Sequence, residues 1–235
     1  MKILVTGATG KVGQKFLEQL SCSELMKNAT AVALCHNRLI NPTERISVVK
    51  GSIADKDTVD SATDGITHVV HLATCKETPS NVMDVTVKGL FWLLEACREK
   101  NDFEQFLLIG GDAGMGHFFY PHPIPVTETQ KHSAYPGCYA LSKVLEEVML
   151  EQYQIQYYLP STCLRAPWIM EKDDFKYSLS FGDDVFGGPV WKDLVSEELA
   201  KRYKEAGNIP LMLNDKGEPI KRNFIHVDDL VQAVM

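Results

Sequence analysis

The sequence predicts an α/β fold with a doubly wound parallel sheet, because short apolar runs alternate with helical patterns through its first two thirds. Between 81 and 100, apolar residues recur at spacings of three and four, which is typical of an amphipathic helix that packs on a sheet. The apolar runs expected to form strands lie at 3–6, 31–35, 46–49, 67–72, 106–109 and 158–164.

A change of pattern near Trp168 predicts two regions, 1–167 and 168–235. The first carries the alternation of strands and helices. The second is expected to be a smaller lobe, with a Gly/Asp/Phe-rich stretch at 181–188, a helix at 191–206 and a strand at 209–213. The segment 117–137 is expected to be a long loop, because its four prolines exclude a regular helix or strand.

Composition excludes several classes of protein. The formal net charge of −7 argues against nucleic acid as the main partner, since phosphate binding requires clustered Lys and Arg. Six cysteines without a C-x-x-C pair argue against a zinc site and fit the reduced thiols of a cytoplasm. The chain starts directly with a strand pattern, and no apolar run reaches the roughly 18 residues of a membrane span. His117, His122 and His132 are irregularly spaced, so no metal is expected.

A glycine loop, Gly7-Ala8-Thr9-Gly10-Lys11-Val12-Gly13, joins the first expected strand to the first expected helix. Glycines there permit a tight turn, close approach of the backbone to a pyrophosphate and tight helix packing. The helix N-terminus presents free N–H groups to the anion. The loop therefore predicts binding of an NAD(P)-type dinucleotide, and the alternative is a glycine-rich turn without a ligand.

The residues after the second expected strand bear on which dinucleotide is bound. His36, Asn37 and Arg38 stand where an acidic residue would accept bonds from the ribose 2′-hydroxyl of NAD. An arginine there can instead pair with a 2′-phosphate. Arg38 therefore favours NADP over NAD, the alternative being a solvated surface arginine.

Tyr139 and Lys143 lie four residues apart on an expected helix that runs to about 149. A free tyrosine has a pKa of about 10, and a nearby ammonium group and an oxidised nicotinamide would both favour the phenolate. Tyr139 is therefore expected to exchange the proton that accompanies hydride transfer. The opposite face of the helix is expected to be buried through an aliphatic stripe of Leu141, Val144, Leu145 and Val148.

With these residues in place, the chain resembles the extended short-chain dehydrogenases/reductases of the NAD-dependent epimerase/dehydratase family. The best-known members of that family act on nucleotide sugars. The resemblance covers nearly the whole chain and implies a Rossmann domain at 1–167, a substrate-binding lobe at 168–235, a sugar or sugar-nucleotide substrate and a homodimer. The supporting segments are the glycine loop, His71-Leu72-Ala73-Thr74, Tyr139 with Lys143, Leu164-Arg165-Ala166-Pro167 and Arg222-Asn223-Phe224-Ile225-His226-Val227-Asp228-Asp229.

The resemblance also implies roles for single residues. Tyr139 would be the general acid/base, and Lys143 would hold the nicotinamide ribose and lower the pKa of the tyrosine. Substrate contacts would come from Asp112, Ala113 and Arg222. The residues implied to line the cofactor, besides these two and the glycines of the loop, are Thr9, Lys11, Val12, His36, Asn37, Arg38, Ser52, Ile53, Leu72, Ala73, Thr74 and Pro167.

Three departures from the family pattern limit that transfer. The Ser or Thr that polarises the substrate carbonyl would fall near Gly111, and losing such a donor typically costs on the order of 10² to 10³ in turnover. Thr74, or Asp112 if protonated or acting through water, would have to replace it. Thr86 stands where the family usually has Asn, and the chain ends at Met235, so the lobe is expected to be incomplete.

The sequence therefore predicts an NAD(P)-dependent oxidoreductase or epimerase that acts on a secondary alcohol or ketone of a sugar-like substrate. The net reaction would be redox, epimerisation or dehydration. The alternative is a dinucleotide-binding sensor or interaction protein that has lost catalysis, because a fold does not establish an activity.

Overall fold

The computed structural model describes residues 1–76, 78–116, 122, 125–172, 174, 195–208, 213–219, 221 and 223–235. The chain divides into two compact units, Met1–Pro167 with Asp228–Met235, and Trp168–Val227. The last eight residues therefore belong to the first unit, although the sequence pattern placed them in the second region.

The first unit is built on a six-stranded sheet of order β3-β2-β1-β4-β5-β6, in which every neighbouring pair is parallel. The order reverses between β1 and β4, which is the switch point where a doubly wound sheet binds its ligand. The predicted fold class is thus confirmed. The strands are β1 (Lys2–Thr6), β2 (Thr30–Cys35), β3 (Ile46–Lys50), β4 (His68–His71), β5 (Gln105–Gly111) and β6 (Ser161–Ala166).

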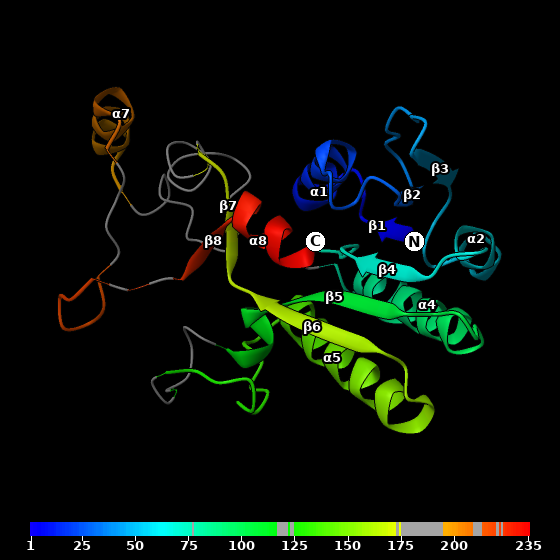
Figure 1. Ribbon diagram of the computed structural model, residues 1–235. Coiled ribbons are helices and arrows are strands. Elements are labelled where there is room, and N and C mark those ends of the chain that lie inside the picture. Colours follow the sequence, from blue (N-terminus) through cyan, green and yellow to red (C-terminus); the bar gives the residue numbers. More distant parts are fainter. Residues whose placement is uncertain are drawn as a thin grey trace. The chain divides into compact units, whose positions relative to one another are not determined.

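Helices cover both faces of this sheet, with α4 and α5 side by side on one face and α1 on the other (Figure 1). The predicted helix at 81–100 is confirmed, although a π-helical stretch, η1, precedes α4. Leu90, Leu93 and Leu94 of α4 are fully buried against the apolar side chains of the central strands. The helical elements are α1 (Lys11–Cys22), α2 (Lys56–Ala62), α3 (Pro79–Asn81), η1 (Val82–Lys88), α4 (Gly89–Arg98), η2 (Asp112–Met115), α5 (Cys138–Tyr157) and α8 (Val227–Val234).

Helix α5 buries a different face from the one predicted. Leu141 is 52% exposed and Val148 is 38% exposed, while Val144 and Leu145 are half-buried, so the aliphatic stripe is not the face that the core encloses. The face turned toward the core holds Lys143 and Glu146 together with small and apolar residues. This expectation was wrong because the two charged side chains pair with one another, as described below, which makes their burial tolerable.

The second unit contains a short parallel pair, β7 (Trp168–Met170) with β8 (Phe224–His226), and the helix α7 (Glu197–Ala206). Ser196 caps α7 by accepting a hydrogen bond from the backbone N–H of Leu199. The predicted glycine-rich stretch at 181–188, most of the predicted strand at 209–213, and Arg222 and His117 lie outside the described residues.

The proline-rich stretch is a loop where the structure describes it. Residues 125–137 form neither helix nor strand, as expected. Within the described part of the chain, no helix is long and apolar enough to cross a membrane.

Candidate active site

The glycine loop follows β1 directly and touches the end of β4. Gly7 has φ of +64°, and a Cβ atom there would lie within 2.8 Å of backbone atoms of Leu72 and Ala73. A Cβ at Gly13 would lie 2.5 Å from the carbonyl oxygen of Gly7. Since real Cβ atoms do not approach backbone this closely, the loop can exist only without these side chains.

Thr6, the last residue of β1, ties the two strand ends together. Its buried hydroxyl accepts hydrogen bonds of 3.1 Å from the backbone N–H groups of Leu72 and Ala73 and lies 2.8 Å from Nδ1 of His71. Because both lone pairs of the hydroxyl are used, its proton is donated to Nδ1. Neutral His71 therefore carries its own proton on Nε2.

The start of α1 offers an anion site beside this loop. Gly10 is the N-cap residue, no side chain caps the helix, and its first turn contains no acidic residue. The N–H groups of that turn and the helix dipole favour a phosphate group at this point. The bare backbone at Gly7 and the helix end thus fit the diphosphate of a dinucleotide.

The other predicted cofactor residues lie at the carboxyl ends of the parallel strands, hence along one edge of the sheet. His36, Asn37 and Arg38 are exposed after β2, Thr74 is exposed after β4, and Pro167 follows β6. Ser52 and Ile53 follow β3. Ile53 is 6% exposed, and its side chain packs against Gly89 of α4, so closely that a Cβ on Gly89 would lie 2.8 Å from Cγ2 of Ile53.

Tyr139 and Lys143 meet at the carboxyl end of β5. Tyr139 is half-buried in the first turn of α5, and Nζ of Lys143 lies 5.7 Å from the centre of its ring. Nζ also donates a hydrogen bond of 3.4 Å to the carbonyl oxygen of Ile109. The structure therefore brings the predicted pair together, with the lysine side chain buried.

A carboxylate that was not predicted lies against this lysine. Glu146 is fully buried, and its Oε2 is 2.8 Å from Nζ of Lys143, while its Oε1 is 3.9 Å from Nε2 of His71. The signal that could have identified it is its position three residues after Lys143, on the same face of the helix.

Burial and charge shift the pKa values of all three groups. Burial raises the pKa of Glu146 to about 7, against the opposing effect of the Lys143 ammonium group. Burial first, and Lys143 second, lower the pKa of His71 to about 3. Burial lowers the pKa of Lys143, but Glu146 and Tyr139 together outweigh it, so this pKa is raised. His71 is therefore neutral at neutral pH, and the charge of the cluster depends on Glu146.

The end of β5 holds the predicted substrate-side residues. Asp112 is half-buried at the start of η2, and Ala113 is buried. A Cβ built on Gly111 would lie 3.8 Å from Cδ of Lys143, an ordinary contact distance, so this position has room for a small side chain. Thr86, at the family's Asn position, is buried and accepts a hydrogen bond of 3.2 Å from the backbone N–H of Cys75.

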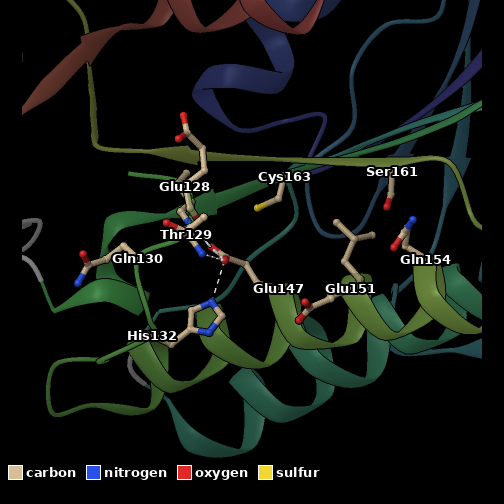
Figure 2. Close-up of a pocket in the computed structure, with 11 residues that line it drawn as sticks. Glu128, Thr129, Gln130, His132, Glu147, Glu151, Gln154, Ser161 and Cys163 are labelled. Atoms are coloured by element: carbon tan, nitrogen blue, oxygen red, sulfur yellow. Dashed lines mark hydrogen bonds and ion pairs between the residues drawn. The ribbon is translucent and has the colours of Figure 1, made fainter. Parts of the chain in front are cut away.

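A separate cavity of about 490 Å³ lies between α5 and β6. Figure 2 shows Glu147 of α5 pointing at His132 of the preceding loop, and their side chains are 2.8 Å apart. Arg165 of β6 contacts the same carboxylate at 2.9 Å. None of the predicted catalytic or cofactor residues lines this cavity.

The described residues also contain no group of three His, Cys, Asp or Glu side chains that could hold a metal ion.

The sequence profile of the NAD dependent epimerase/dehydratase family matches residues 3–170. The chain belongs to this family. The matched region contains the glycine loop and both residues of the Tyr139–Lys143 pair, so the resemblance inferred from the motifs is confirmed.

Individual relatives agree with this family. The chain is 30% identical over 109 residues to dihydroflavonol 4-reductase of Zea mays, a match that spans 41% of this chain and 30% of that protein. A short-chain dehydrogenase/reductase superfamily protein from Agrobacterium tumefaciens with bound NAD superposes with a TM-score of 0.77 at 21% identity, covering 100% of this chain and 72% of that one. UDP-glucose 4-epimerase from Thermotoga maritima with UDP-glucose has a TM-score of 0.73 at 19% identity, covering 99% and 72%.

These similarities confirm the extended short-chain dehydrogenase fold. The family and the NAD in the Agrobacterium tumefaciens protein also support a nicotinamide dinucleotide as cofactor.

Proposed function

We propose that this chain binds NAD(P) and transfers hydride to or from a secondary alcohol or ketone of a sugar-like substrate, including nucleotide sugars. The observation that carries the proposal is that Lys143 Nζ lies 5.7 Å from the ring of Tyr139, at the same edge of the sheet as the glycine loop. The solved structure with UDP-glucose supports the substrate class.

The residues of the chain would do the proton chemistry, while the bound nicotinamide supplies or accepts the hydride. In the oxidising direction the phenolate of Tyr139 accepts the hydroxyl proton of the substrate as hydride leaves carbon. In the reducing direction the phenol returns that proton to the new alkoxide. The positive charge of Lys143 favours the phenolate, which brings its pKa toward neutral pH.

The test is Tyr139→Phe, assayed with NAD(P) and a panel of UDP-sugars and sugar alcohols. Turnover is expected to fall by about 10²-fold or more, because a positioned acid/base contributes 10² to 10⁴. Binding of the dinucleotide, followed by nicotinamide fluorescence, should stay within about twofold, since the phosphate contacts come from the loop. Tyr157→Phe, at the far end of α5, is the matched control. Wild-type turnover in Tyr139→Phe would contradict the proposal.

The dinucleotide is proposed to be NADP. Arg38 is exposed just beyond β2, where a guanidinium group can pair with a 2′-phosphate, and no acidic residue lies beside it in the His36-Asn37-Arg38 segment. In Arg38→Ala the ratio of KM for NADH to KM for NADPH should drop about tenfold. A ratio equal to that of the wild type removes this preference and leaves NAD.

A homodimer is proposed through the outer faces of α4 and α5. Leu141, Val148 and Ile155 follow one another at seven-residue spacing on α5 and are all exposed, as is Phe91 of α4. Exposed apolar side chains repeated along a helix are typical of an interface. Light scattering should give twice the chain mass for the wild type and the single mass for Val148→Lys.

A cytoplasmic location is also proposed. None of the six cysteines, all of which are described, forms a disulfide, which fits that location.

The second candidate function is a dinucleotide-binding sensor, favoured by the missing hydroxyl at Gly111. Two results together would decide for the sensor. Nicotinamide binding would survive in Tyr139→Phe, and no sugar or ketone would change the NADPH absorbance in the presence of the wild-type protein.

A further inference from the structure

The carboxylate of Glu146 is buried in the layer between α5 and the sheet, where a charged group has no access to water. The titratable groups that face it are Lys143 and Glu147 of α5, His71 of β4 and Cys163 of β6. Of these, only Lys143 carries a positive charge at neutral pH. A carboxylate in such a place is costly unless a cation offsets it, so Glu146 and Lys143 depend on one another.

The contact between them is an ion pair in which Nζ and Oε2 are 2.8 Å apart. After burial, the charge of Lys143 has the largest effect on the pKa of Glu146, and their hydrogen bond has a smaller one. The interaction is therefore mainly one of charge. Replacing the carboxylate by an amide of the same shape would remove that charge and leave an oxygen beside Nζ.

Lys143 in turn lies between two anionic groups when Tyr139 is ionised. Its Nζ is 2.8 Å from Glu146 on one side and 5.7 Å from the centre of the Tyr139 ring on the other. An ammonium group whose charge is already offset by Glu146 stabilises a phenolate less than an ammonium group that faces the phenolate alone.

We propose that Glu146 is a positioning residue that offsets the charge of Lys143 and thereby sets how strongly Lys143 favours the phenolate of Tyr139. The role rests on the proposed function of Tyr139 and Lys143 as the proton-transfer pair. It extends that pair into the core, because Glu146 also faces His71, which Thr6 connects to the glycine loop. An ionised Glu146 weakens the effect of Lys143 on Tyr139, and a neutral Glu146 strengthens it.

The experiment measures the pKa of Tyr139 directly in the cofactor-free full chain, so it needs no substrate. Ionisation of the eight tyrosines is followed by near-ultraviolet absorbance against pH, and each curve is subtracted from that of the same protein carrying Tyr139→Phe. The difference reports on Tyr139 alone. The proteins compared are the wild type, Glu146→Gln, Glu146→Asp and the control Glu151→Gln, which removes an exposed carboxylate from the same helix.

In Glu146→Gln the pKa of Tyr139 is expected to be about one unit lower than in the wild type. The forming phenolate itself favours the ammonium form of Lys143, and Glu146 no longer offsets that charge. Glu146→Asp, whose carboxylate is one methylene farther away, should fall between the two. Glu151→Gln should match the wild type. An unchanged or higher pKa of Tyr139 in Glu146→Gln overturns the proposal. If Glu146→Gln does not fold, an unchanged or higher pKa of Tyr139 in Glu146→Asp overturns the proposal.

Failure of this inference is distinguishable from failure of the proposed function. Full turnover in Tyr139→Phe would contradict the function while leaving the titration of Tyr139 to be read as before. Conversely, loss of turnover in Tyr139→Phe with no shift in Glu146→Gln would uphold the function and reject the role of Glu146.

Discussion

The two halves of the site, the glycine loop and the buried cluster of Lys143, Glu146 and His71, are built on opposite principles. The loop works because side chains are absent, so that backbone meets backbone at Gly7 and N–H groups stay open to an anion. The cluster works through charged side chains that the core encloses. The loop is therefore sensitive to a Cβ atom added at Gly7 or Gly13, whereas the cluster responds to pH.

The first comparison, of Gly7→Ala with Gly65→Ala, tests the steric half. Both glycines have nearly the same positive φ, +64° and +61°, so both variants suffer the left-handed penalty of about 1–2 kcal/mol. Only Gly7 would also place a Cβ within 2.8 Å of the backbone of Leu72 and Ala73, just after β4, whereas Gly65 has nothing closer than the flexible end of Lys2. Urea unfolding should show Gly7→Ala less stable than Gly65→Ala by about 2 kcal/mol or more.

The same pair of variants separates binding from stability. Gly7→Ala should lose nicotinamide-dinucleotide binding, measured by fluorescence, because the turn that presents the backbone to the diphosphate is displaced. Gly65→Ala should keep it. Equal loss in both variants would mean that the positive φ, and not the contact with Leu72 and Ala73, governs the loop.

The second effect tests the charged half. In Lys143→Met the carboxylate of Glu146 loses its cation, and breaking one side of a buried pair typically costs about 3–5 kcal/mol. The loss of unfolding free energy should be larger at pH 8, where Glu146 tends to ionise, than at pH 5.5, where it is protonated. The double variant Lys143→Met/Glu146→Gln should recover part of the loss at pH 8. Equal stability of the single and double variants at pH 8 would show that the pair is not coupled.

The same contrast explains what the sequence could predict. The glycine loop was predictable because the sequence itself identifies each glycine, and these glycines follow the first strand directly. The sheet was predictable because buried parallel strands are continuous apolar runs. The role of each predicted cofactor residue is still a prediction, since only the position of its strand end has been established.

Lys143 was predicted, but its partner Glu146 was not, because a Lys and a Glu three residues apart are also typical of a solvated helix face. Apolar Leu141 and Val148 looked like the buried face and are exposed instead. The connection of His71 to Thr6 spans 65 positions in the sequence and exists only through the parallel register of β1 and β4. Such contacts require the fold and cannot be deduced from spacing.

The third effect uses pH to separate the two buried groups of the cluster. The pKa of His71 is lowered from 6.5 to about 3, so the unfolded chain binds the extra proton and stability rises with pH between these values. The pKa of Glu146 is raised from 4.5 to about 7, so the folded chain binds the extra proton and stability falls as pH rises. Between pH 4.5 and 6.5 the two slopes oppose each other.

Removing either group should expose the slope of the other. As pH rises from 4.5 to 6.5, the unfolding free energy of Glu146→Gln should increase relative to that of the wild type. That of His71→Asn, whose side-chain oxygen can still accept from Thr6, should decrease over the same range. Each variant should change by on the order of 2 kcal/mol relative to the wild type, and the difference between the two by about twice that, as urea titrations at several pH values would measure. Parallel curves for the two variants would show that neither group keeps its shifted pKa.

The smallest expected effect concerns the point where the two halves of the site meet, the end of β5. Gly111 lacks the hydroxyl that polarises a substrate carbonyl in the family, but unlike Gly7 it has space, since a Cβ there would lie 3.8 Å from Cδ of Lys143. Gly111→Ser should therefore fold with unfolding free energy within about 1 kcal/mol of the wild type. If the hydroxyl reaches the substrate carbonyl, kcat should rise about tenfold, which is less than the 10² to 10³ that such a donor contributes in a site built around it. Gly111→Ala, which adds the Cβ without the hydroxyl, is the matched control and should leave kcat unchanged. A kcat that is equal in the two variants would indicate that another group, with Asp112 and Thr74 as the candidates, already polarises the carbonyl.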